Sequence, residues 1–152
     1  MSIDARLAEL GIELPAPAAA VANYVPFVRS GNLVHIAGQL SNDASGGIKG
    51  TVGADVDLDT AVAGARLCGI NLLAQIKAAC DGDLGRVVRV VKLGGFVQAG
   101  PDFIDIPKVI NGCSDLMVDV FGDAGRHARS AVGVYRLPLG FAVEVDAIVE
   151  VR

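Results

Sequence analysis

The sequence predicts an α+β domain in which two main helices cover one face of a mixed β-sheet. Stretches rich in β-branched residues alternate with two stretches of helical apolar periodicity, in the order strand, strand, helix, strand, helix, strand, strand. The 152 residues suit a single domain, 1–152. The chain is 52% hydrophobic with a mean hydropathy of +0.50, an apolar balance that favours self-association.

The N-terminal part predicts a short helix and then a β-hairpin. Residues 3–10 form the helix, and a Pro-rich stretch ends it, so residues 1–20 are a helix with its lead-in. Tyr24–Val28 and Leu33–Gln39 are the two strands, and Ser30-Gly31-Asn32 between them predicts a tight turn.

The middle of the chain contains both main helices. A glycine-rich loop over 41–53 precedes Asp57, which opens a long helix that ends at Asp81-Gly82-Asp83. Residues 86–97 form a strand, and Asp105 caps the second helix. Apolar residues recur about every 3.6 positions in both helices: Leu58, Val62, Ala65, Leu72, Ile76 and Ala79 in the first, and Ile106, Val109, Ile110, Cys113, Met117 and Val120 in the second.

The segment from His127 to Arg152 predicts two strands joined by a Leu-Pro-Leu-Gly turn, which is a second hairpin. Two charges, Arg129 and Glu144, interrupt these apolar strands. A desolvated guanidinium without a partner costs several kcal/mol, so Arg129 requires one. That partner is either a carboxylate of the protein or an anion from outside.

Strand periodicity places Arg129 on one face with Ala131, Gly133 and Tyr135. These small neighbours leave shallow space before the guanidinium, whose planar fork suits a bidentate carboxylate. The alternative is an edge arginine paired with Asp or Glu on the next strand.

Three further residues are candidates for a site. Glu144 shares a strand face with Asp146. Either this face is exposed to solvent, or Glu144 is a general base that orients a water molecule. Tyr24 at a strand start is typical of core packing. The small residues Ala37 and Gly38 end a strand and expose backbone amides that could bind a ligand oxygen.

Composition excludes several classes. The net charge is −4 and the 13 basic residues are scattered, which argues against nucleic-acid binding. No apolar run is long enough for a membrane span and no secretory signal is present, so we expect a cytoplasmic protein. The cysteines Cys68, Cys80 and Cys113 predict buried thiols, and with two histidines they form no metal pattern. Neither a GxSxG nor a nucleotide-binding glycine motif occurs.

The C-terminal residues resemble the Rid family (reactive intermediate deaminase, also called YjgF-like or L-PSP endoribonuclease-like). The most specific match is ARSAVGV at 128–134, followed by Leu137-Pro138 and by VEVDAI at 143–148. Tyr24-Val25, Ser30-Gly31-Asn32 and Gly38-Gln39 match the N-terminal hairpin of the family. Asn111 falls where many members carry asparagine. The resemblance covers most of the chain from about Tyr24 to Val151.

This resemblance implies a chorismate-mutase-like fold and a homotrimer with sites between subunits. It implies that Arg129 grips the carboxylate of a 2-imino or enamine acid, that Tyr24 and Gly38 line the cleft, and that Glu144 helps to place the attacking water. Asn111 is added to the substrate-binding set, and no metal or cofactor is implied. Ala131 replaces a cysteine that is frequent in deaminating members, and Ala37 replaces a serine.

Three functions follow from the resemblance. The first is hydrolytic deamination of 2-imino acids to 2-ketoacids and ammonia, a reaction that a positioned water can accelerate. The second is non-catalytic binding of 2-ketoacids, for which Ala37 and Ala131 are arguments. The third is the endoribonuclease or translation-inhibitor role attached to some relatives, against which the acidic balance of the chain counts.

Overall fold

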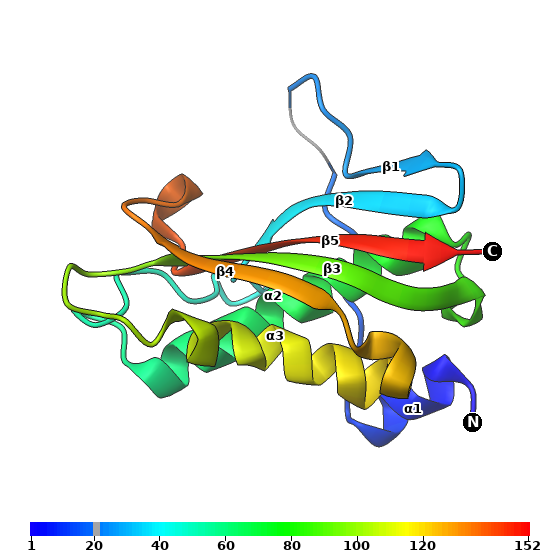
Figure 1. Ribbon diagram of the computed structural model, residues 1–152, viewed down its shortest axis with the longest axis horizontal. Coiled ribbons are helices and arrows are strands. Elements are labelled where there is room, and N and C mark those ends of the chain that lie inside the picture. The colour runs from blue at the N-terminus through cyan, green and yellow to red at the C-terminus, as the bar shows by residue number, and fades with distance from the viewer. Residues whose placement is uncertain (20–21) are drawn as a thin grey trace.

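A five-stranded mixed sheet with helices on one face forms the body of the molecule, as predicted (Figure 1). The computed structural model describes residues 1–19 and 22–152, so residue 20 of the predicted lead-in lies outside the described residues. The strands are β1 (Phe27–Ser30), β2 (Leu33–Leu40), β3 (Val87–Gln98), β4 (Ala128–Val134) and β5 (Val143–Val151). The helices are α1 (Ile3–Glu9), α2 (Leu58–Ala79) and α3 (Ile106–Phe121), with short 3₁₀ turns η1 (Leu84–Arg86), η2 (Gly122–Gly125) and η3 (Pro138–Gly140). No helix in this described part is long and apolar enough to cross a membrane.

Local signals set the bounds of both main helices. Asp57 caps α2, and its carboxylate accepts a hydrogen bond from the backbone N–H of Thr60 at 2.8 Å. Gly82, with φ +91°, follows the end of α2 as predicted. Asp105 occupies the cap position of α3 but makes no capping hydrogen bond, and its carboxylate instead lies 3.6 Å from Lys108 Nζ.

The first predicted hairpin is confirmed. β1 and β2 are antiparallel, Val28 pairs with His35, and Gly31 turns the chain with φ +61°. The first strand begins at Phe27, three residues later than predicted from Tyr24. Pro26 lies just before it, and proline has no N–H to donate to a ladder.

The second predicted hairpin is wrong, because β3 lies between β4 and β5. The strand order is β1-β2-β5-β3-β4, with β4 parallel to β3 and β5 antiparallel to both β2 and β3. The connection from β3 to β4 through α3 is a βαβ crossover, which places β4 at the edge of the sheet. β5, whose alternate residues are all apolar, takes the central position where both of its edges are hydrogen-bonded.

The two faces of the sheet differ in burial, because the described helices cover only one of them. On β5 the residues Val143, Val145, Ala147, Val149 and Val151 are at most 3% exposed and face the helices. Their alternates Glu144, Asp146, Ile148 and Glu150 are half-buried on the other face, which we call the open face. Figure 1 shows that α2 and α3 lie together on one side of the sheet, so no helix among the described residues covers the open face.

The helices α2 and α3 approach one another closely at Gly112. A methyl group built there would overlap the backbone carbonyl oxygen of Val62 on α2. A methyl group at Gly64 of α2 would instead meet its nearest neighbours at 3.4 Å, an ordinary contact. Close packing of the two helices therefore requires glycine at position 112 but not at position 64, although both residues lie inside helices.

We expect Gly112→Ala to lower the free energy of unfolding by about 1–3 kcal/mol, because backbone must move to admit the methyl group. Gly64→Ala is the matched control, and its better helix propensity should leave stability unchanged or raise it by up to about 1 kcal/mol. Urea unfolding of both variants tests this, and equal stabilities would contradict it.

Candidate functional site

Arg129 extends toward α3 on the helix-covered side of the edge strand β4. It pairs with Leu93 of β3, which is fully buried under the helices, and cross-strand neighbours share a face. Its Nη1 donates to Asn111 Oδ1 at 2.8 Å and to Ser114 Oγ at 3.2 Å. Within residues 1–19 and 22–152, no carboxylate oxygen lies within 4.0 Å of its nitrogens. Neutral oxygens therefore hold this cation, and no carboxylate of the described residues neutralises its charge.

Asn111 and Ser114 reach the same guanidinium because they lie three residues apart on α3. Side chains at this spacing are neighbours on a helix surface. Asn111 was expected at the site from the family resemblance alone, whereas Ser114 was not predicted. The available signal was that Ser114 follows Asn111 by one turn on the polar side of a helix whose other face is apolar.

His127 completes this group. Its Nε2 lies 2.9 Å from Ser114 Oγ and its Nδ1 lies 2.6 Å from the carbonyl oxygen of Gly125. Burial lowers the pKa of His127 and the nearby charge of Arg129 lowers it further, while the hydrogen bond to Gly125 opposes them. The fold brings Ser114 to His127 from thirteen residues away, a contact that was not predicted.

These side chains line a surface pocket of about 290 Å³, which we call the arginine pocket. Its lining residues are Asn111, Ser114, Asp115, Val118, Arg126, His127 and Arg129. Arg126 is largely exposed and lies 3.4 Å from Asp123, so Arg129 is the half-buried cation of the pocket. Such a setting suits a small anion that takes two hydrogen bonds from one guanidinium.

Glu144 lies in a different place, above Gly38 on the open face. A methyl group on Gly38 would come within 2.5 Å of Glu144 Oε2, so glycine is needed for the carboxylate to lie there. A β-bulge prepares this contact: Ile36 pairs with Ala147 and Gln39 with Val145, so Ala37 and Gly38 together oppose Asp146.

The environment of Glu144 favours its uncharged form. Leu40 and Phe96 are its partners on the two neighbouring strands, and both are half-buried. Burial raises the pKa of Glu144, and the negative charge of Asp146 raises it further. Burial also raises the pKa of Asp146, while a hydrogen bond from the Gly94 backbone and the charge of Lys92 oppose that change.

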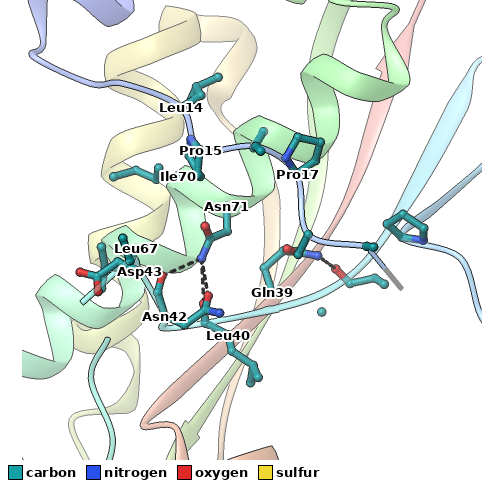
Figure 2. A pocket seen from close by; sticks show the side chains of 18 of the residues that line it. Leu14, Pro15, Pro17, Gln39, Leu40, Asn42, Asp43, Leu67, Ile70 and Asn71 are labelled. Carbon is teal, nitrogen blue, oxygen red and sulfur yellow. Dashed lines mark hydrogen bonds between the residues drawn. The ribbon is translucent and has the colours of Figure 1, made fainter. Parts of the chain in front are cut away.

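Tyr24 and Gly38 also line a larger cavity of about 670 Å³ between the lead-in, β2 and α2 (Figure 2). Figure 2 shows Asn71 of α2 directed at the end of β2, where its Nδ2 donates to Leu40 O and Asn42 Oδ1 at 3.1 and 2.9 Å. The described residues that line this larger cavity include Glu13 and Asp43 but no Lys, Arg or His. Although it is larger, this cavity offers a carboxylate no cation, so the arginine pocket is the better anion site.

The five predicted site residues thus fall into two groups. Arg129 and Asn111 form one, whereas in the other Gly38 lies against Glu144 and shares a cavity with Tyr24. Arg129 belongs to the helix-covered face and Glu144 to the open face, with β3 between their strands. One copy of the chain therefore cannot bring Arg129 and Glu144 to the same ligand.

The three cysteines are buried, as predicted, and none is an available nucleophile. Burial raises the pKa of Cys113 to about 12, against the opposing charge of Arg129, and it also raises the pKa of Cys68 and Cys80. The thiolate is the reactive form, so these thiols are inert near neutral pH. Among the described residues, no group of three or more His, Cys, Asp or Glu side chains is placed to hold a metal ion.

We expect Glu144→Gln to stabilise the fold at about pH 7.5, where the native carboxylate is ionised at a cost, by less than about 1 kcal/mol. The raised pKa means that the folded state binds its proton more tightly than the unfolded state. The advantage of the variant must therefore shrink as pH falls through that pKa and Glu144 becomes neutral. Melting temperatures at about pH 7.5 and pH 4 test this, and a difference independent of pH would refute it.

Comparisons with known proteins agree with the fold. Residues 4–150 match the model of the family described as "YjgF/chorismate mutase-like, putative endoribonuclease". The protein TCP17 of Trypanosoma cruzi is 50% identical over 152 residues, which cover 99% of this chain and 94% of that protein. The crystal structure of Atu1372 from Agrobacterium tumefaciens, a protein of unknown function, is 50% identical with a TM-score of 0.93, over 99% of this chain and 92% of that one.

A second solved structure contains a bound small molecule. It is TdcF from E. coli with bound serine, 28% identical with a TM-score of 0.61, over 90% of this chain and 93% of that one. The family model spans almost the whole chain, and relatives at 50% identity match it nearly from end to end. The chain belongs to the YjgF/chorismate-mutase-like family.

Proposed function

We propose that this protein binds a small 2-imino or 2-keto acid through Arg129 and hydrolyses the imino form to a 2-ketoacid and ammonia. The observation that carries this proposal is the state of the guanidinium. Arg129 is half-buried, is oriented by Asn111 and Ser114, and has no carboxylate partner in the part of the chain that the structure describes. A ligand carboxylate would supply the missing negative charge.

The proposed site is shared between two copies of the chain in a homotrimer. One copy supplies Arg129 and Asn111, and its neighbour supplies Tyr24, Gly38 and Glu144. The separation of Arg129 and Glu144 on opposite faces of the sheet supports this arrangement. The open face also leaves apolar side chains uncovered, with Val28 53% and Val132 46% exposed, which favours burial against another copy.

The proposed chemistry needs positioning and one oriented water. Arg129 holds the carboxylate so that the adjacent C=N carbon faces the neighbour's Glu144. Glu144 takes a proton from water as the water oxygen attacks that carbon, and it returns this proton to the imine nitrogen to give a neutral carbinolamine. Transfer of the hydroxyl proton to the nitrogen through the same carboxylate then breaks the C–N bond, which releases ammonia and leaves the 2-ketoacid. Imines hydrolyse readily in water, so fixing the reactants and a general base is sufficient assistance.

A raised pKa fits Glu144 for this task, because a base whose pKa is closer to neutral accepts a proton more readily in the transition state. The serine-bound relative supports a ligand of this class, since serine carries a carboxylate beside a nitrogen-bearing carbon. The side chains of Ala37 and Ala131 cannot assist by hydrogen bonding, because both are methyl groups.

That absence favours a second candidate, a trimer that binds 2-ketoacids without catalysis. Ala131 follows Arg129 by two residues on the same strand face, and Ala37 lies in the bulge next to Gly38. A hydroxyl or thiol at these positions would have offered the ligand a further donor. Ketoacid binding without accelerated ketoacid release from an imine would select this candidate.

Replacing Arg129 tests carboxylate binding directly. We expect Arg129→Ala to weaken 2-ketobutyrate binding by roughly thirtyfold or more, about 2 kcal/mol, and Arg129→Lys to weaken it less because charge remains without the fork. Isothermal calorimetry provides the measurement. Arg136→Ala is the control, since that arginine stacks on Tyr135 outside both pockets. Unchanged affinity in Arg129→Ala would overturn the proposed ligand site.

Mixed oligomers test the shared site and the catalysis together. An amino-acid oxidase generates the imine in situ, and ketoacid release is followed with co-expressed Arg129→Ala and Glu144→Gln chains carrying different tags. Each variant alone should be inactive. Random mixing in a trimer should restore about a quarter of the sites, because a site with both native groups then forms between unlike chains. Mixed oligomers without recovered activity would argue against a site shared in this way.

A further inference from the structure

Behind Arg129, Ser114 and His127 form a chain of hydrogen bonds that the proposed chemistry does not use. It runs from the carbonyl oxygen of Gly125 to His127, on to Ser114 Oγ and then to Arg129 Nη1, over 2.6, 2.9 and 3.2 Å. Both Ser114 and His127 line the arginine pocket, so their polar atoms lie beside any anion held there.

The direction of each hydrogen bond in this chain is fixed by its ends. A carbonyl oxygen only accepts, so His127 Nδ1 carries a hydrogen. In the neutral ring Nε2 is then an acceptor, and it takes the single hydrogen of the Ser114 hydroxyl. A guanidinium only donates, so Ser114 Oγ accepts from Arg129.

Protonation of His127 reverses the central hydrogen bond. Nε2 gains a hydrogen and donates it to Ser114 Oγ, and the hydroxyl must then direct its own hydrogen elsewhere. The arginine pocket is the space that Ser114 lines, so a carboxylate on Arg129 would be a ready acceptor. The bound anion would then receive a hydrogen bond from Ser114 as well as from Arg129.

We propose that His127 is a positioning residue whose protonation is linked to carboxylate binding at Arg129, with the Ser114 hydroxyl turning toward the ligand when His127 gains its proton. This inference rests on the proposed carboxylate site and specifies how that site responds to pH. By linkage, a ligand that binds the protonated form better must also raise the proton affinity of His127.

The charges around His127 support the linkage. Asp115 on α3, Arg126, and Arg129 on β4 line the pocket together with His127. Arg126 is paired with Asp123, and Arg89 on β3 donates to Arg126 O, next to His127 in the chain. The charge of Arg129 lowers the pKa of His127, and a carboxylate on Arg129 would offset that charge. The pKa of His127 must therefore rise on binding, and affinity must increase as pH falls from neutral through it.

Nuclear magnetic resonance tests the inference with His127 intact. The chain has two histidines, so His35→Gln leaves one imidazole signal, that of His127. This variant is titrated between about pH 4.5 and pH 8 with and without saturating 2-ketobutyrate. We expect a higher midpoint with the ligand, and each unit of increase corresponds to about tenfold tighter binding below both midpoints. The same midpoint in both titrations would overturn the inference.

Calorimetry in two buffers of different ionisation enthalpy provides the second measurement. The native protein should take up protons on binding 2-ketobutyrate at about pH 6, and His127→Gln should take up fewer, because glutamine can accept from Ser114 but cannot titrate. Ser114→Ala should bind with a shallower pH dependence, whereas His35→Gln should match the native protein.

The two proposals fail in different ways. If 2-ketobutyrate does not bind at any pH between about 5 and 8, the proposed function and this inference both fall. If it binds and depends on Arg129, but His127→Gln takes up as many protons as the native protein, only the inference falls.

Discussion

The alternation of β5 is the constraint on which the rest of the molecule depends. Its odd-numbered residues from Val143 to Val151 form the floor of the core beneath α2 and α3, so its even-numbered residues must point the other way. Because β5 lies at the centre of the sheet, its alternation also determines which face each paired residue of the neighbouring strands occupies. Glu144 is thereby committed to the open face, and the crossover through α3 commits Arg129 to the helix-covered side of the edge strand.

The manner in which Arg129 is held has chemical consequences. A protein carboxylate would orient the guanidinium equally well, but it would also cancel the charge that an anionic ligand requires. Two neutral oxygens from α3 fix the geometry and leave the charge in place. The apolar face of the same helix packs in the core against α2 and β3, so the core holds Asn111 and Ser114 in a fixed position beside the pocket.

Local sequence signals predicted the helices and strands well, but they did not predict which strands lie next to each other in the sheet. The caps and periodicity of α2 and α3 and the turn at Gly31 depend on residues close in sequence, and these features were recognised. The strands β4 and β5 follow one another with turn residues between them, which is also the pattern of a hairpin. Insertion of β3 between them depends on pairings across about fifty residues, for which the chain carries no local mark.

The site shows the same division. Arg129 and Glu144 stand out because a charge inside an apolar strand requires an explanation, and a family motif identified Asn111 and Gly38. Whether Arg129 had a carboxylate partner could be decided only by tertiary structure. The bulge that brings Gly38 beneath Glu144 and the contact of Ser114 with His127 are likewise long-range events without a sequence pattern of their own.

The burial of all three thiols has a practical consequence for the open face. Because all three thiols are buried, we expect thiol-reactive dyes to leave the native chain unlabelled at neutral pH. A single cysteine introduced at Ser130, which is exposed and pairs with Gly94 beside Asp146, would then carry the only label. The fluorescence and quenching of that label would reveal directly whether water or a second copy of the chain covers this side of the sheet.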